Sequence, residues 1–165
     1  MSEPIIEQIA IWLKEALAEI TEANGYQQTL AVKRPEDTYI DEQAIENLTT
    51  IIVQGDSEPD GEGTMEELFW LQQFDISTFF LAQRDAALSV DTRINRVAAD
   101  IHKRLGLELS DIVTNNGTLC SGLAYRFVFL PIEIGIVESL AATVLNVPIG
   151  VAYAVKRTNP YEQIS

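Results

Sequence analysis

Apolar residues recur at three- and four-residue steps at the start of the chain. The stripe consists of Ile6, Ile9, Leu13, Leu17 and Ile20, with charged side chains on most of the opposite side. This spacing predicts an amphipathic helix over residues 4–23, with Pro4 in its first turn. Asn24 and Gly25 follow it and favour a left-handed stop.

The next hundred positions predict three strands and a second helix. Tyr26–Lys33 is expected to form a first strand, and a short helix is expected around Asp41–Leu48. Thr49–Gln54 is rich in β-branched residues and predicts a second strand. Leu68–Ala82 alternates as a third, which would span roughly 50 Å if unbroken, so part of it is expected to project or bend.

The second long helix is predicted to begin near Asp91 and to end before Gly106. Its apolar stripe is Ile94, Val97, Ala98, Ile101 and Leu105. The other face carries four of the 11 basic residues of the chain: Arg93, Arg96, Lys103 and Arg104. Such a face is either plainly solvated or contacts an acidic loop of a neighbouring subunit.

The C-terminal third predicts strands again. They are expected at Leu123–Leu130, after a turn at residues 115–117, and within Val144–Lys156. Pro131 and Pro148 cannot donate to a ladder, so each is expected at an edge, a bulge or a break. The order of elements predicts an α+β fold, in which a mostly antiparallel sheet carries two amphipathic helices within a single domain over residues 1–165.

Composition narrows the classes of function. With 47% hydrophobic and 22% charged residues over 165 positions, the chain is expected to fold around a real core. A formal net charge of -14 disfavours tight binding to nucleic acid or anionic lipid. The single cysteine, Cys120, excludes an intrachain disulfide and fits a reducing cytoplasm. No segment predicts export or membrane insertion.

Candidate chemistry is sparse. The chain has no P-loop, GxGxxG, HExxH or GxSxG motif, so we expect neither an enzyme nor a cofactor. His102 has no nucleophile at a recognisable spacing and is expected on the surface, whereas Cys120 is expected to be buried or half-buried.

The segment Asp56–Glu67 nearly copies an EF-hand calcium loop. It departs from that pattern at Glu58, Pro59 and Gly63, and a strand precedes it instead of a helix. A solvated acidic loop without a dedicated metal, spanning residues 55–67, is the prediction, and calcium binding is the alternative.

The C-terminal residues and the layout resemble a known family. The final strand has the form Val151-Ala-Tyr153-Ala-Val155 and leads into Asn159-Pro160-Tyr161, while the opening helix leads into Gly25-Tyr26. These features, with the order of helix, strands, helix and strands over nearly the whole chain, resemble the tail terminator (tail completion) proteins of long-tailed bacteriophages.

The resemblance implies a structural virion protein, assembled in the bacterial host cytoplasm. Its copies would form a ring, usually a hexamer, that ends polymerisation of the tail tube and joins the tail to the head connector. The implied partners are further copies of itself, the tail tube protein and a neck protein, with DNA passing through the channel without specific binding.

The candidate interface residues lie on the second helix and at the C-terminal end: Arg93, Arg96, Lys103, Arg104, Tyr153, Pro160 and Tyr161. Another phage neck or head-completion protein, or a non-viral acidic adaptor or binding module, remains an alternative function.

Overall fold

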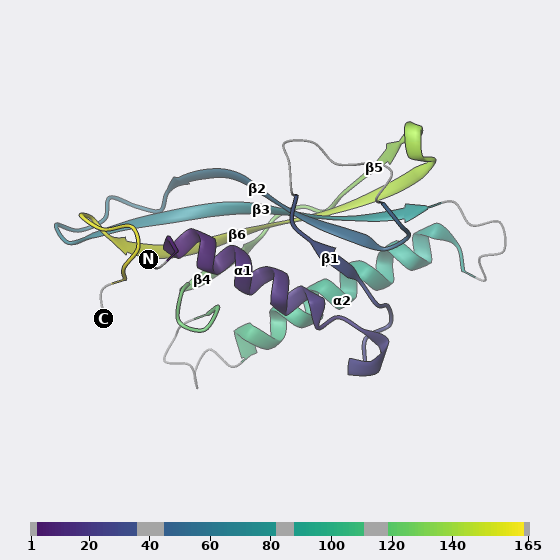
Figure 1. Cartoon of the computed structure of the whole chain (residues 1–165), viewed down its shortest axis with the longest axis horizontal. Coiled ribbons are helices and arrows are strands. Elements are labelled where there is room, and N and C mark those ends of the chain that lie inside the picture. The colour runs from purple at the N-terminus through teal and green to yellow at the C-terminus, as the bar shows by residue number, and fades with distance from the viewer. Residues whose placement is uncertain (1–2, 36–44, 82–87, 111–118, 164–165) are drawn as a thin grey trace.

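The computed structural model describes residues 3–35, 45–81, 88–110 and 119–163. Two helices, α1 (Ile5–Ala18) and α2 (Val90–Ser110), lie on one face of a six-stranded sheet (Figure 1). The strands are β1 (Ala31–Lys33), β2 (Thr49–Pro59), β3 (Glu67–Leu81), β4 (Arg126–Phe129), β5 (Glu133–Val137) and β6 (Ala142–Lys156). Within these residues, the one-turn 3-10 helices are η1 (Glu22–Asn24) and η3 (Glu138–Leu140).

The sheet has the order β1-β2-β3-β6-β4, and β5 also pairs with β6. Every pair is antiparallel except β1 with β2, which run parallel. The predicted α+β fold, with a mostly antiparallel sheet and two helices packed on it, is therefore confirmed. Among the described residues, no helix is both long and apolar enough to cross a membrane.

The two longest strands form the axis of the molecule. β3 and β6 have 15 residues each and pair over their full length, from Glu67 opposite Lys156 to Leu81 opposite Ala142. The β2–β3 hairpin extends past the helices as an arm, and the segment after β6 and the start of α1 lie beside it (Figure 1). The long third strand thus projects, as its sequence predicts.

The main core lies between the sheet and the helices. Phe74, Ile76 and Phe80 of β3 point toward the helices, as do alternate residues of β6 from Leu145 to Val155. The stripes of α1 and α2 pack on them. The opposite face of the sheet has a smaller cluster formed by Ile45, Ile51, Phe79 and Ala142.

Both helices differ from prediction at their ends. α1 stops at Ala18 because the chain turns there, and the side chain of Thr21 accepts a hydrogen bond from the backbone N–H of Asn24 to cap η1. Gly25 then supplies the predicted left-handed conformation, with a φ of 85°. α2 runs through Gly106 to Ser110, because Leu109 beyond the glycine still packs against the core.

The strand boundaries also differ. The first strand shrinks to β1, and the strand predicted from Leu123 begins only at Arg126. The sequence reading missed β5. The first half of the short helix predicted around Asp41–Leu48, residues 41–44, lies outside the described residues, and its described half is not helical. The predicted turn at 115–117 lies outside them too.

Pro148 sits inside central strand β6, where a proline is unusual. Its carbonyl accepts a hydrogen bond from the N–H of Leu130, so its ring nitrogen faces the β4 and β5 side of the strand. On that side β5 pairs up to Asn146 and β4 begins opposite Ile149. The backbone N–H that Pro148 lacks is therefore at the position of β6 where pairing changes from β5 to β4. Pro131 lies in the connection between β4 and β5.

Candidate assembly surface

β5 carries the most exposed isoleucines of the described chain. Ile134 is 61% exposed and Ile136 is 77% exposed, and Ile132 just before the strand is 41% exposed. The register places Ile134 opposite the buried Leu145, so the side chains of Ile134 and Ile136 emerge on the helix side of the sheet. Within the described residues β5 pairs only with β6, so its other edge has no strand partner among them. An apolar edge of this kind favours association with another chain.

The edge of β2 beyond its pairing with β1 differs from the edge of β5. Beyond its pairing with β1, this strand has a register irregularity between Gln54 and Ser57 and ends in Asp56, Glu58 and Pro59. Bulges, carboxylates and proline are the usual protections of an edge strand. β5 has one carboxylate, Glu133, and no such break, so of these two edges β5 is the one suited to a partner.

The four basic residues of α2 do not act together. Arg104 donates to the carboxylate of Glu19 at 3.0 Å and lies over the ring of Trp12, both contributed by the α1 region. Lys103 donates to the carbonyl of Gly25 at 3.3 Å and lies over Tyr26. Within one subunit Arg104 thus joins α2 to the α1 region, and Lys103 joins α2 to the segment after η1.

Arg93 and Arg96 lie in the first half of α2 and are half-buried. The guanidinium of Arg93 lies 6.0 Å from the ring centroid of Phe80, and its Nε and Nη1 are buried without a hydrogen-bond partner. Among the described residues neither arginine forms an ion pair. These two members of the predicted basic face therefore have no carboxylate partner among the described residues.

Of the three C-terminal candidates, one is buried and two are exposed. Tyr153 packs in the core between sheet and helices, where burial raises its pKa, so it is not presented to a partner as the sequence reading expected. Pro160 and Tyr161 are exposed, and the carbonyl of Pro160 accepts from the N–H of Ile5 at the start of α1. The final segment therefore closes over the start of α1 and leaves Tyr161 on the surface.

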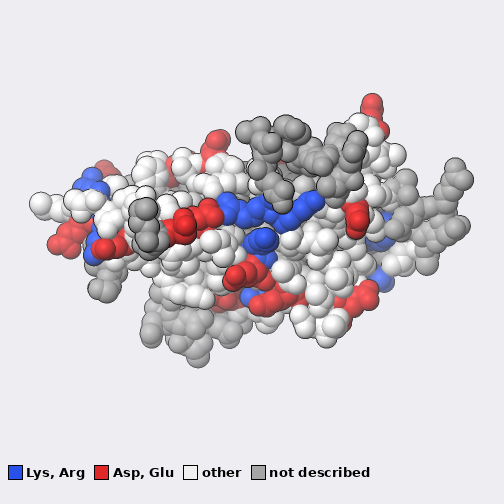
Figure 2. Space-filling model, viewed as in Figure 1, with Lys and Arg blue, Asp and Glu red and all other residues white. Residues whose placement is uncertain are grey.

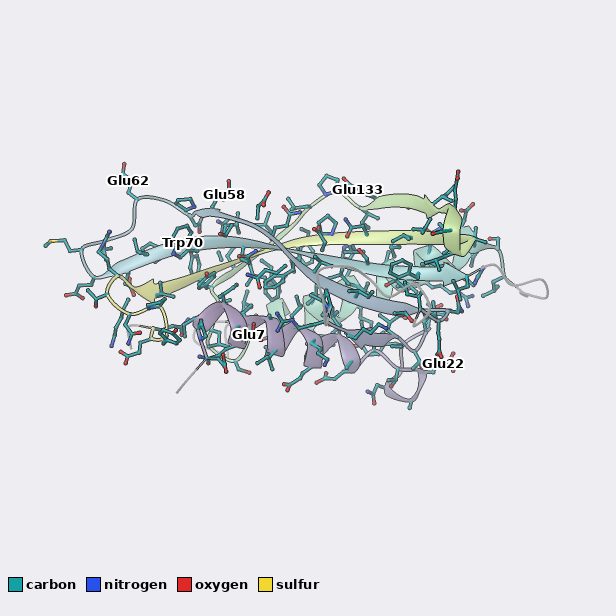
Figure 3. The ribbon with its side chains drawn as sticks, turned by 45° about the horizontal axis from the view of Figure 1, so that its top comes forward. Glu7, Glu22, Glu58, Glu62, Trp70 and Glu133 are labelled. Atoms are coloured by element: carbon teal, nitrogen blue, oxygen red, sulfur yellow. The ribbon has the colours of Figure 1, made fainter. Side chains whose placement is uncertain are left out.

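The arm ends in a tip that spans residues 60–66. The predicted loop over 55–67 is longer than this, because β2 continues to Pro59 and β3 starts at Glu67. Glu62, labelled in Figure 3, lies at this distal end. Met65, in the same tip, is 94% exposed. Among the described residues, no group of three or more metal-ligating side chains is arranged to hold an ion.

A set of hydrogen bonds fixes the shape of the tip. Thr64 Oγ1 accepts from the backbone N–H groups of Glu66 and Glu67 at 3.2 and 2.9 Å. Arg157 donates from Nη2 to the carbonyl of Thr64 at 2.8 Å. Gly63 has a φ of 73°, and a Cβ there would lie 2.7 Å from the carbonyl of Glu67, so glycine is required. The exposed methionine thus stands on a well-supported turn.

Asp60 joins the base of the tip to β4. Its carboxylate accepts from the Tyr125 hydroxyl at 2.5 Å and from Arg126 Nη2 at 2.7 Å. These two hydrogen bonds, with that of Tyr125 the stronger cause, hold the pKa of Asp60 below its ordinary value of 3.8.

The lowered pKa gives a pH prediction. A carboxyl group with a lowered folded pKa stabilises the protein above 3.8, and this contribution disappears as the pH falls below that value. Asp60→Asn should therefore lower the denaturation midpoint at pH 6, and the difference from wild type should shrink below pH 3.8. Urea titrations of both proteins at pH 6 and at acidic pH measure it. A difference that stays constant with pH would contradict the role of this carboxylate.

His102 and Cys120, the two residues considered for catalysis, both pack against neighbouring side chains or in the core. His102 is half-buried, with its ring edge-on to Phe129 at 5.4 Å between centroids. Cys120 is buried, as predicted, and burial raises the pKa of its thiol far above the ordinary value. A thiol held protonated in this way is a poor nucleophile.

The sequence reading missed the isoleucines of β5 and the exposed Met65. The signal for β5 was present, because Ile132, Ile134 and Ile136 alternate with other residues at the period of a strand. Met65 follows two glycines and lies among carboxylates, which marks a loop but does not indicate that the loop is held in one shape.

No protein-family model matches this chain, and no curated protein matches it.

Proposed function

We propose that this chain is the subunit of a ring, most simply a hexamer, that ends the tail tube of a long-tailed phage. It would stop polymerisation of the tube protein at the head-proximal end and join the tail to the head connector. The observation that carries the proposal is the open β5 edge with Ile132, Ile134 and Ile136 exposed, because such a surface is expected to be covered in the working state.

The charge of the chain is compatible with that role. Six copies would carry 6 × -14 = -84 formal charges. An acidic channel offers DNA no phosphate contacts, so DNA would pass without binding. The face shown in Figure 2 carries Asp and Glu side chains around a central group of Lys and Arg side chains.

Assembly of the tube in the presence of this chain tests the proposal. When the tube protein of the same phage polymerises with and without it, the chain should shorten the tubes and appear as a cap at one end by electron microscopy. Tubes of unchanged length without any cap would overturn the proposal, and the alternatives of a neck protein or a non-viral adaptor would then take its place.

A further inference from the structure

Two uncovered features lie at opposite ends of the long axis. The arm tip with Glu62 lies at one end, and the hairpin formed by β5 and the start of β6 lies toward the other (Figures 1 and 3). We call it the β5 hairpin. The tip presents Met65, and the β5 hairpin presents Ile134 and Ile136. Each feature is too small to form a stable interface by itself.

The β5 end also carries basic groups. Phe80 of β3, Thr143 of β6 and Ile136 of β5 lie in one row across the sheet. Arg93 lies over Phe80 at one end of this row, and Ile136 lies at the other, about 10 Å away across two strand spacings. Arg96 follows on the next turn of α2. We call this surface, made of Ile134, Ile136, Arg93 and Arg96, the shelf.

The tip has the complementary character. Its exposed methionine is flanked by the carboxylates of Glu62, Glu66 and Glu67. Contact between two tips would bring these like charges together, which is unfavourable, whereas tip against shelf would bring carboxylates to arginines and methionine to isoleucine. Charge and apolar surface therefore both favour contact between unlike ends.

We propose that the arm tip of one copy docks on the shelf of the next, with Met65 against Ile134 and Ile136 and the tip glutamates beside Arg93 and Arg96. Contact between unlike ends of identical subunits is heterologous, and such contacts close into rings when the rotation allows it. This inference rests on the proposed function, because it names the contact that would build the ring. The rigid support of the tip by Arg157 and Thr64 fits it, since a fixed turn loses little entropy on docking.

Charge exchange between two variants tests the contact. Glu62→Lys/Glu66→Lys makes the tip basic, and Arg96→Glu makes the shelf more acidic. Each variant alone should self-associate at least about tenfold more weakly than wild type. The first brings its new lysines to Arg93 and Arg96, and the second removes one arginine and places a carboxylate beside the tip glutamates. An equimolar mixture of the two should assemble again, because the unchanged acidic tip can then meet the unchanged arginines, and the basic tip can meet the new carboxylate of the other shelf. Sedimentation velocity over a range of concentrations measures both results.

A matched control carries the same change in charge elsewhere. Glu15→Lys/Glu22→Lys alters the net charge equally, from -14 to -10, at exposed positions outside the tip and the shelf. It should associate as wild type does.

Failure of the contact between tip and shelf can be distinguished from failure of the proposed function. If wild type forms rings and the mixture fails to assemble, or if the single variants assemble normally, the contact between tip and shelf is wrong and the proposed function stands. If wild type forms no oligomer even at the end of a tail tube, both proposals fall.

Discussion

Ile134→Asp/Ile136→Asp is expected to abolish ring formation and leave a folded monomer. Covering each exposed isoleucine contributes roughly 1.5–3 kcal/mol, so losing both weakens association by about 100-fold or more, since 1.4 kcal/mol is a factor of ten. Each new aspartate would also have to be buried without a partner, which costs more. The monomer should survive, because the two side chains are 61% and 77% exposed within it.

Two further variants distinguish the loss of apolar contact at β5 from the effect of added charge. Ile134→Thr/Ile136→Thr keeps the β-branched shape and the net charge, and it should also weaken assembly, though less. Ile11→Asp adds a charge at an isoleucine of α1 that is 40% exposed, and it should assemble normally. Mass photometry gives the oligomer distribution, and circular dichroism reports the fold. Normal rings from the double aspartate variant would show that the β5 edge faces solvent in the assembly.

Asp100→Ala is expected to cause the largest loss of stability among single changes to polar residues of α2. Asp100 is 3% exposed, and its Oδ2 accepts from the backbone N–H groups of Gln27 and Gln28 at 2.9 and 3.1 Å. Alanine would leave both donors without this partner, at a cost of about 2–4 kcal/mol. The hydrogen bonds fix the segment after η1 against α2, so that segment should loosen first.

Asp100→Asn is the matched variant. Its amide oxygen can still accept from both donors, so the loss of unfolding free energy should be clearly smaller than for alanine. Urea denaturation compares the three proteins, and hydrogen exchange at Gln27 and Gln28 shows whether these amides open locally. Equal stability of the alanine variant and wild type would show that water replaces the carboxylate without cost.

Sequence periodicity predicted the elements that pack on the core. The stripe from Ile6 to Ile20 and that from Ile94 to Leu105 pack into the core. These positions are set by local spacing, which the sequence displays directly.

Positions that depend on contacts distant in the sequence could not be predicted. Arg104 looked like part of a free basic face because nothing in the chain order shows that Glu19 and Trp12 lie beside it. The tip of the arm looked like a loose loop because the hydrogen bond from Arg157 to Thr64 joins residues 93 positions apart. Helix ends were misjudged for a related reason, since Leu109 draws α2 past Gly106 by tertiary packing.

The mass and shape of the purified protein test the central claim most directly. Native mass spectrometry combined with negative-stain microscopy should show closed rings of a single size, with six copies the expected number, either in free solution or at the ends of tail tubes. A protein that stays monomeric at high concentration and does not bind tube ends would contradict the account.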